Sequence, residues 1–231
     1  AFMSSAAVIV AAGRGRRMGF DKLLAPICGK PVLQWTLDAF LQAKTVDSIV
    51  VVTNEERFAA LDLGTDKPVS RTNGDRERFL SVMRGLDAIP TVPTYVVVHD
   101  GARPLIIPDQ IDEVLNVARD KGAASLARRV TETLKKTDSN QYTCSAVPRE
   151  GLWIMETPQA FRFKMLRQAY SVAESRRMDV TDDVSAAEAI GVHTKLIENP
   201  LPNIKITIPQ DLAVAEALMK TWQEEATTRG D

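Results

Sequence analysis

The stretch Val8-Ile9-Val10-Ala11-Ala12-Gly13-Arg14-Gly15-Arg16-Arg17-Met18-Gly19-Phe20-Asp21-Lys22 decides the fold of this chain of 231 residues. It begins with small and β-branched residues, typical of a buried strand, and continues into a segment with three glycines and four cations. Glycines let the backbone approach a ligand closely, so that its N–H groups can point at phosphate oxygens. The side chains of Arg14, Arg16, Arg17 and Lys22 add positive charge that suits phosphate. The stretch therefore predicts a strand that opens into a polyphosphate-binding loop, with a solvated surface loop as the plainer alternative.

Two familiar nucleotide motifs do not fit this stretch. Gly13, Gly15 and Gly19 are spaced one residue too widely for the dinucleotide pattern G-x-G-x-x-G. The next β-branched run, residues 49–52, ends in Thr53-Asn54 and not in the acid that would hold a ribose. No Gly-Lys-Ser/Thr follows the first glycine as a P-loop requires. A nicotinamide-dependent oxidoreductase is therefore disfavoured, and a non-catalytic nucleotide-binding protein stays open.

The composition indicates a globular protein without an extended charged surface. Hydrophobic residues make up 45% of the chain, and 29 basic against 30 acidic residues leave a net charge of −1, which argues against nucleic-acid binding. The two cysteines, Cys28 and Cys144, form no metal or disulfide pattern, so a reducing compartment is expected. No apolar run approaches the roughly 18 residues of a membrane span, and no long apolar signal segment opens the chain. We expect a cytoplasmic protein that binds neither nucleic acid nor membrane.

Strand and helix patterns alternate along most of the chain, which predicts an α/β fold. We expect a single Rossmann-like domain over residues 3–226, with a mostly parallel central sheet flanked by helices. Residues 151–161 are expected to lead into the helix at 164–174. The expected strands are 8–10, 49–52, 67–72, 95–99, 123–127, 192–197 and 204–208, and the expected helices are 31–41, 55–61, 76–86, 108–121, 164–174, 184–190 and 209–222.

Three loops should meet at one edge of this sheet. In open parallel sheets, ligands bind beyond the carboxyl ends of the strands. Residues 11–22, 73–78 and 100–104 all follow or flank such ends, and the helix after residue 76 would point its N-terminal amides there. These loops are the predicted ligand site.

Residues 130–147 depart from the alternation. Two short β-patterned runs flank the turn Asp138-Ser139-Asn140, which predicts a projecting hairpin. Its faces are too polar for burial within its own domain, so we expect an arm that meets a second subunit in a homodimer. An ordinary solvated hairpin is the alternative.

Taken in order, the motifs resemble the 2-C-methyl-D-erythritol 4-phosphate cytidylyltransferase family of the non-mevalonate isoprenoid pathway. The resemblance covers nearly the whole chain, which departs from the family at Asn73, in place of a glycine, and at Gly101, in place of an alanine. It is carried by Ala11-Ala12-Gly13, Arg16-Arg17-Met18, Lys22, Gly74-Asp75-Arg76-Glu77-Arg78, Ser81-Val82, His99-Asp100-Gly101-Ala102-Arg103-Pro104, Arg149, Leu152-Trp153, Thr157-Pro158-Gln159-Ala160-Phe161, Thr181-Asp182 and Asn203-Ile204-Lys205-Ile206-Thr207.

The resemblance implies a nucleotidyltransferase that joins CTP to methylerythritol 4-phosphate and releases pyrophosphate. Such a reaction needs two anions brought together and developing charge neutralised. By resemblance, Arg17, Lys22 and Lys205 are the catalytic cations; from the residues alone, Lys205 is more simply a solvated lysine at a strand end. The resemblance assigns CTP binding to Ala11, Ala12, Gly13, Gly15, Gly74, Asp75 and Ser81.

Asp100 is the candidate ligand for a Mg²⁺ cofactor, because it ends a buried strand beside the triphosphate loop. A carboxylate that orients a substrate hydroxyl or caps a loop is the alternative. His99 is expected to be packed and hydrogen-bonded, with no acid–base role. The resemblance assigns binding of the acceptor, a polyol phosphate, to Asp100, Arg103, Arg149, Thr157, Thr181 and Lys205, with Arg149 reaching across a dimer interface.

The nearest rival is a related cytidylyltransferase that uses ribitol 5-phosphate. It shares the glycine loop and the Thr157-Pro158-Gln159 segment, so few residues separate the two acceptors. The form of Ala11-Ala12-Gly13, Leu152-Trp153 and Thr181-Asp182-Asp183 favours methylerythritol 4-phosphate.

Overall fold

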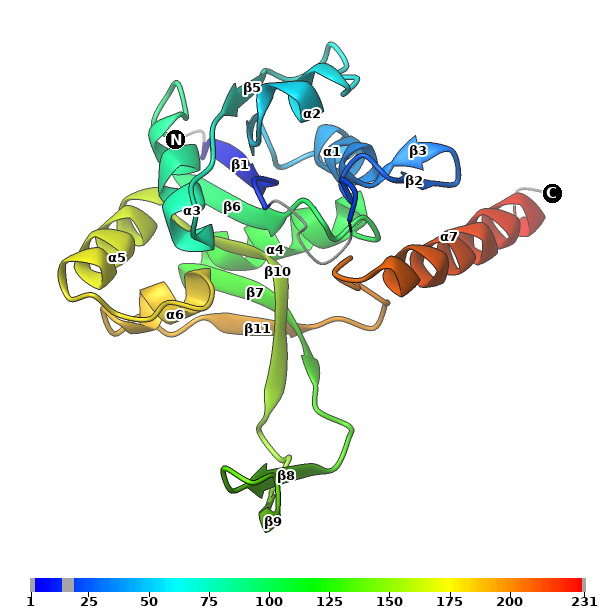
Figure 1. The fold of residues 1–231 in the computed structure, drawn as a ribbon. Helices are drawn as coiled ribbons and strands as arrows, with labels where there is room; N and C mark the ends of the chain where they lie inside the picture. The colour runs from blue at the N-terminus through cyan, green and yellow to red at the C-terminus, as the bar shows by residue number, and fades with distance from the viewer. Residues whose placement is uncertain (1–2, 14–18, 230–231) are drawn as a thin grey trace.

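The computed structural model describes residues 3–13 and 19–229, and within these ranges seven strands form one central sheet. The order across the sheet is β11-β7-β10-β6-β1-β4-β5, and all pairings are parallel except those of β10, which runs against both β6 and β7 (Figure 1). The expected mostly parallel α/β sheet is confirmed. Its strands are β1 (Ser5–Val10), β4 (Ser48–Val52), β5 (Val69–Thr72), β6 (Tyr95–Asp100), β7 (Ala123–Arg129), β10 (Trp153–Arg162) and β11 (Lys195–Glu198), and β2 (Pro26–Ile27) pairs separately with β3 (Lys30–Pro31).

Strand β10 was missed by the sequence analysis, which assigned no strand to residues 151–161. A proline inside a β-pattern speaks against a central strand, because it cannot donate a ladder hydrogen bond. The structure accommodates Pro158 where the pairing of β10 with β7 shifts register between Met155 and Gln159. This irregularity lies beside Thr157, so it also shapes the ligand site described below.

The predicted strand at residues 204–208 is wrong. Ile206 N donates to Ala102 O at 2.8 Å, but no ladder of such bonds continues on either side among the described residues. The Asp211 carboxylate instead accepts hydrogen bonds from the backbone N–H groups of Thr207 and Ile208, which ends the extended segment at the start of the last helix. Lys205 therefore projects from an irregular segment and not from a strand.

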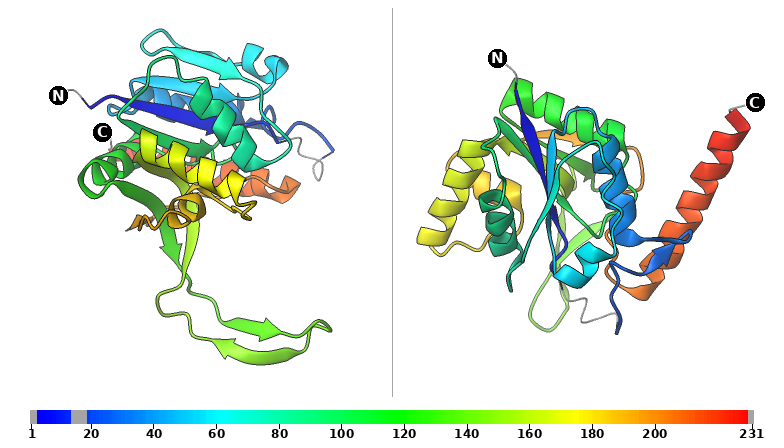
Figure 2. Two further views of the ribbon diagram at one scale, coloured as in Figure 1. Left: turned by 90° about the vertical axis from the view of Figure 1, so that its left-hand side faces the viewer. Right: turned by 90° about the horizontal axis from the view of Figure 1, so that it is seen from above.

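Helices cover both faces of the sheet (Figure 2). Helices α1, α4 and α7 pack on one face, and α3, α5 and α6 pack on the other. The predicted helices are confirmed, with α3 starting two residues later than expected, at Arg78, and α7 extending to Arg229. They are α1 (Val32–Gln42), α2 (Glu55–Ala59), α3 (Arg78–Asp87), α4 (Pro108–Lys121), α5 (Phe163–Ser175), α6 (Asp183–Glu188) and α7 (Pro209–Arg229).

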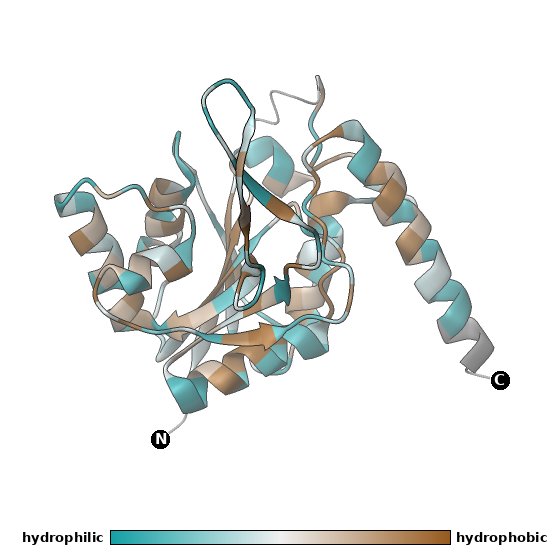
Figure 3. Ribbon diagram, turned by 90° about the horizontal axis from the view of Figure 1, so that it is seen from below, coloured by the Kyte–Doolittle hydropathy of each residue, from teal (hydrophilic) through white to brown (hydrophobic). Residues whose placement is uncertain are grey.

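The alternation of side chains along β1 divides the core into two layers. Ala7 and Ile9 belong to the cluster under α1 and α4, whereas Ala6 and Val8 belong to the cluster under α3 and α5. Because helices cover both faces of the sheet, the side chains of β1 are buried on either side, and its sequence is a continuous apolar run. Helix α7 lies at the rim of the molecule, and hydrophobic and hydrophilic residues both occur along it (Figure 3).

The predicted hairpin arm is present. Its strands, β8 (Leu134–Thr137) and β9 (Thr143–Val147), pair with each other and project away from the main sheet (Figure 1). Val130 N donates to Leu152 O at 3.1 Å, so the two ends of the arm lie side by side. Most arm residues are exposed, including Tyr142. Across the described ranges, no helix has the length and apolar character that crossing a membrane requires.

Candidate active site

The loops that follow β1, β5 and β6 meet at the carboxyl edge of the sheet, as predicted. Val10 is in register with Val52 on one side and with Asp100 on the other. Beyond the strand ends, Ala11 N donates to Val52 O and Gly101 N donates to Val10 O, both at 2.8 Å. Together with the bond from Thr53 N to Thr72 O at 2.9 Å, they tie the ends of β1, β4, β5 and β6 to one another.

A first cavity, of about 390 Å³, opens over this edge. We call it the nucleotide cavity. Of the residues predicted to bind CTP, Ala11, Ala12, Gly13, Asp75 and Ser81 line it, together with Lys22. Gly15 and Arg17 lie outside the described residues.

Gly74 sits where no other residue fits. A Cβ added there would lie 2.0 Å from the Cβ of Ala12 and 3.0 Å from Ser81 Oγ. The next residue, Asp75, donates its N–H to Ser81 Oγ at 2.9 Å, and its carboxylate accepts two hydrogen bonds from Arg84, at 2.9 and 2.6 Å. The segment thus presents backbone groups to the nucleotide cavity from a fixed position.

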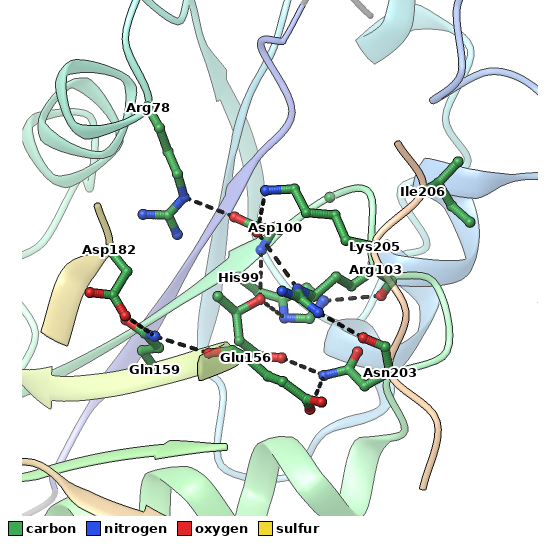
Figure 4. A network of polar contacts seen from close by, with 12 residues as sticks. Arg78, His99, Asp100, Arg103, Glu156, Gln159, Asp182, Asn203, Lys205 and Ile206 are labelled. Atoms are coloured by element: carbon green, nitrogen blue, oxygen red, sulfur yellow. Dashed lines mark hydrogen bonds and ion pairs between the residues drawn. The ribbon is translucent and has the colours of Figure 1, made fainter. Parts of the chain in front are cut away.

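Asp100 lies at the centre of a cationic cluster (Figure 4). Arg78 Nε donates to Oδ1 at 2.9 Å, Lys205 Nζ donates to Oδ2 at 2.9 Å, and Arg103 Nε lies 3.6 Å from Oδ2. Burial alone would raise the pKa of Asp100, but Arg78, Lys205 and Arg103 outweigh it and hold the pKa well below its usual range. Asp100 is therefore ionised throughout the pH range in which proteins work.

Arg78 is a site residue that the sequence analysis did not single out. Besides Asp100, it binds Asp183, whose carboxylate is fully buried and also accepts a hydrogen bond from Tyr170. Arg78 thus joins α3 to α6 across the end of the sheet. The available signal was its place in the charged segment after Gly74, at the start of a predicted helix.

A second cavity, of about 340 Å³, lies on the other side of Asp100. We call it the acceptor cavity. Three residues that the sequence analysis assigned to acceptor binding, Arg103, Thr157 and Thr181, line it, along with Glu156, Gln159 and Asp182, which it did not assign. Arg103 Nη1 donates to Asn203 O at 2.7 Å, while its buried Nε has no hydrogen-bond partner among the described residues.

Arg149 is not brought to this cavity within one chain. It lies exposed near the base of the arm, where its guanidinium donates to the carbonyl of Thr131. Within a single chain, Arg149 is therefore not placed to bind the acceptor. The prediction that Arg149 reaches the acceptor site of a second subunit remains a prediction.

His99 is packed and hydrogen-bonded, as expected, and its bonds define its tautomer. Nε2 lies 3.1 Å from Arg103 O, which can only accept, so Nε2 carries the proton. Nδ1 then accepts from Thr157 Oγ1 at 2.9 Å, and that oxygen in turn accepts from Asp100 N at 3.0 Å. Burial lowers the pKa of His99 to about 4, so the neutral ring holds Thr157 in place at ordinary pH.

The two cavities share three lining residues: Arg78, Asp100 and Lys205. Lys22 faces the nucleotide side, where Nζ donates to Ile206 O at 2.6 Å. An anion in one cavity and an anion in the other would therefore meet at the same group of charges. The arrangement suits transfer of a phosphoryl-type group between two phosphorylated ligands.

A metal at this site would depend on Asp100. Over the described residues, no group of three or more His, Cys, Asp or Glu side chains comes together as a metal site. Mg²⁺ bound to nucleotides commonly takes only one or two protein carboxylates and completes its shell with phosphate oxygens and water. The single carboxylate at the cavity boundary fits that pattern.

Comparison with known proteins gives a consistent set of relatives. The chain matches the profile of the 2-C-methyl-D-erythritol 4-phosphate cytidylyltransferase family over residues 5–221. It is 40% identical to the cytidylyltransferase of that name from Parasynechococcus marenigrum (strain WH8102), over 94% of this chain and 99% of the relative. It is 42% identical to a bifunctional IspD/IspF enzyme of Desulforudis audaxviator (strain MP104C), over 92% of this chain and 56% of that enzyme.

Solved structures agree with these sequence relatives. The structure of 2-C-methyl-D-erythritol 4-phosphate cytidylyltransferase from Thermus thermophilus superposes with a TM-score of 0.77 at 31% identity, over 95% of this chain and 100% of that one. The corresponding structure from Francisella tularensis gives 0.80 at 31% identity, over 93% and 99%.

Proposed function

The chain belongs to the 2-C-methyl-D-erythritol 4-phosphate cytidylyltransferase family, and we propose how its residues transfer the cytidylyl group of CTP to 2-C-methyl-D-erythritol 4-phosphate. A phosphate oxygen of the acceptor forms a bond to the α-phosphorus of CTP, and the bond to pyrophosphate breaks on the opposite side. The products are CDP-methylerythritol and pyrophosphate. The observation that carries the proposal is the wall of Arg78, Asp100 and Lys205 shared by the two cavities.

CTP occupies the nucleotide cavity in this proposal. Backbone groups of Ala11, Ala12, Gly74 and Asp75 contact cytosine, because the segment at Gly74 lies directly against Ala12. A rigid polar rim of this kind rejects bases whose edge groups do not match. Ser81 supports the rim through its bond to the Asp75 N–H.

Cations then stabilise the reacting phosphates. Lys22 neutralises the departing pyrophosphate, and Lys205 turns from Asp100 towards the α-phosphate, where negative charge gathers in the transition state. The Lys205 side chain is 40% exposed, so this movement does not require the core to open. Arg17 is proposed to assist Lys22 on the strength of the family resemblance alone.

The acceptor occupies the second cavity. Arg103, whose buried Nε makes no hydrogen bond among the described residues, binds its phosphate, while Thr157, Thr181 and the carboxylate of Asp100 position the polyol. The attacking phosphate is already ionised at neutral pH, so no general base is needed. The neutral His99 fits this reading, since it serves only to orient Thr157.

We propose Asp100 as the protein ligand for Mg²⁺, with triphosphate oxygens and water completing the shell. The ion supplies neutralisation of the triphosphate charge when bound. Asp100 Oδ2 accepts a hydrogen bond from Lys205, so a turn of Lys205 towards the α-phosphate would leave that oxygen available to hold the ion.

We further propose that the enzyme works as a homodimer in the cytoplasm. The arm exposes nearly all its residues in one chain, and Arg149 at its base has no access to its own acceptor cavity. A second copy that received the arm would bring Arg149 to the acceptor phosphate. Light scattering tests this: a variant with residues 131–151 replaced by a short turn should have half the mass of the wild type, and an unchanged mass would contradict the proposal.

The function itself is tested by pyrophosphate release from CTP and Mg²⁺, with 2-C-methyl-D-erythritol 4-phosphate and ribitol 5-phosphate compared as acceptors. Turnover is expected with the first acceptor only. Turnover with ribitol 5-phosphate alone would reassign the acceptor cavity, and no turnover with either would overturn the assignment.

A further inference from the structure

Arg57, on the short helix α2, is a buried arginine that has no part in the reaction as described above. Only 5% of its surface is exposed. A buried charge is costly unless it is paired and hydrogen-bonded, so the partners of such a residue indicate its role. Each guanidinium nitrogen has one: Nε donates to Asp21 Oδ2 at 2.6 Å, Nη1 donates to Ala11 O at 2.6 Å, and Nη2 donates to Gly13 O at 3.0 Å.

These three partners belong to the two ends of the glycine-rich loop. Ala11 and Gly13 directly follow β1, and Asp21 directly precedes Lys22. Asp21 Oδ1 also accepts the backbone N–H of Leu23 at 3.0 Å, so the carboxylate fixes the backbone on either side of Lys22. Because a guanidinium is planar and rigid, it sets the distance and angle between the two loop ends.

Arg57 is itself held to the sheet. Its backbone N–H donates to the Asn54 side chain at 2.9 Å, which caps α2. Thr53, the residue after β4, donates through Oγ1 to Ala11 O at 3.1 Å, the same carbonyl that Arg57 binds. The guanidinium is therefore held in a fixed position relative to the end of β4. Strand β4 pairs with β1, from which the loop departs.

We propose that Arg57 is a positioning residue of the nucleotide site: it holds the backbone of Ala11 and Gly13 and the base of Lys22 in the geometry that binds CTP. The inference rests on the proposed function of the loop. Arg57 acts through these partners and does not touch the acceptor cavity. Its loss should therefore weaken CTP binding selectively.

The test compares Arg57→Lys and Arg57→Met with the wild type. Lysine keeps the charge but loses the rigid fork. Since misplacement of binding groups by about 1 Å can cost on the order of a hundredfold, we expect the KM for CTP to rise about tenfold in Arg57→Lys and about a hundredfold in Arg57→Met. The KM for 2-C-methyl-D-erythritol 4-phosphate should stay within about twofold.

Leu115→Ala provides the control for general destabilisation. Leu115 is fully buried on α4 and makes no part of either cavity. All variants are assayed well below their melting temperatures, and Asp21→Asn serves as a second probe that leaves Arg57 in place. Asp21→Asn should raise the KM for CTP less than Arg57→Met does, and adding it to Arg57→Met should raise the KM little further, because the contact is already broken.

A KM for CTP within twofold of wild type in both Arg57 variants would overturn the inference. The inference would also be overturned if Leu115→Ala, at the same loss of melting temperature, raised the KM for CTP as much as the Arg57 variants do. Calorimetric titration of CTP separates this inference from the proposed function. A wild type that binds CTP but does not turn it over would overturn the function, while weaker CTP binding by the Arg57 variants would still support the positioning role.

Discussion

The buried His99 makes the stability of this enzyme depend on pH in a predictable way. Burial lowers its pKa in the folded protein from 6.5 to about 4. Below pH 6.5 the unfolded chain takes up a proton at this position and the folded protein does not, so stability falls as the pH decreases towards 4. The contribution is fully present above pH 6.5, and by pH 5 about 2 kcal/mol of it should be lost.

The chain is well suited to measuring this effect, since it has only two histidines. The free energy of unfolding is obtained from urea titrations at half-unit steps between pH 5 and 7.5. His99→Gln keeps a donor for the Arg103 carbonyl and removes the titrating group, so it should flatten the profile between pH 5 and 6.5 while lowering stability at pH 7. His193→Gln, at an exposed position, is the matched control and should keep the wild-type slope.

Parallel pH profiles for the wild type and His99→Gln would refute the reasoning. They would show that the folded protein admits a proton at His99 near pH 6.5, in spite of the bond between Nδ1 and the Thr157 hydroxyl. If the pH dependence of the free energy of unfolding disappeared in His193→Gln instead, the titrating group would be the exposed His193 and not His99.

The remaining predictions concern activity. Lys205→Ala should lower kcat by roughly a hundredfold or more in pyrophosphate release, with a circular dichroism spectrum like that of the wild type; unchanged turnover would remove it from the transition state. Asp100→Asn should lower activity and raise the Mg²⁺ concentration needed for half-maximal rate, whereas an unaltered Mg²⁺ dependence would argue against its role as ligand. Gly74→Ala places a Cβ 2.0 Å from that of Ala12 and should raise the KM for CTP more than the KM for the acceptor, as separate titrations would show. Arg149→Met and Lys205→Ala, each inactive alone, should regain up to about a quarter of wild-type activity when refolded together, because half of the chains pair as heterodimers with one complete site; no recovery would contradict a shared site.

The nucleotide half of the site could be predicted from sequence because it is built from local signals. An apolar strand, a glycine-rich loop and a basic residue follow one another at 8–22, and the carboxyl ends of parallel strands necessarily share an edge. Asp100 was found in the same way, at the end of the apolar run that forms β6. Such features need only the order of the chain and the direction of the strands.

The features that sequence reasoning missed depend on contacts between distant segments. Arg78 binds Asp183 across 105 residues, and the bonds of Arg57 to Ala11 and Gly13 span more than 40 residues. Strand β10 was missed because it contains Pro158, and a central strand rarely tolerates proline. The register shift that accommodates this proline can be recognised only once β10 is paired with β7. Residues 204–208 have a strand-like pattern, but a single backbone bond to Ala102 holds them in place.

The separation of Lys205 from Asp100 by 105 residues also bears on how the protein is made. Ribosomal synthesis proceeds from the N-terminus, and the residues proposed to contact cytosine have all been added once the chain reaches Asp75. The pair between Lys205 and Asp100 can form only after the 105 residues that separate them have been added. A nascent chain that stops before residue 205 therefore carries the nucleotide loops without the lysine that makes them reactive, and catalytic competence is acquired well after the nucleotide loops have been made.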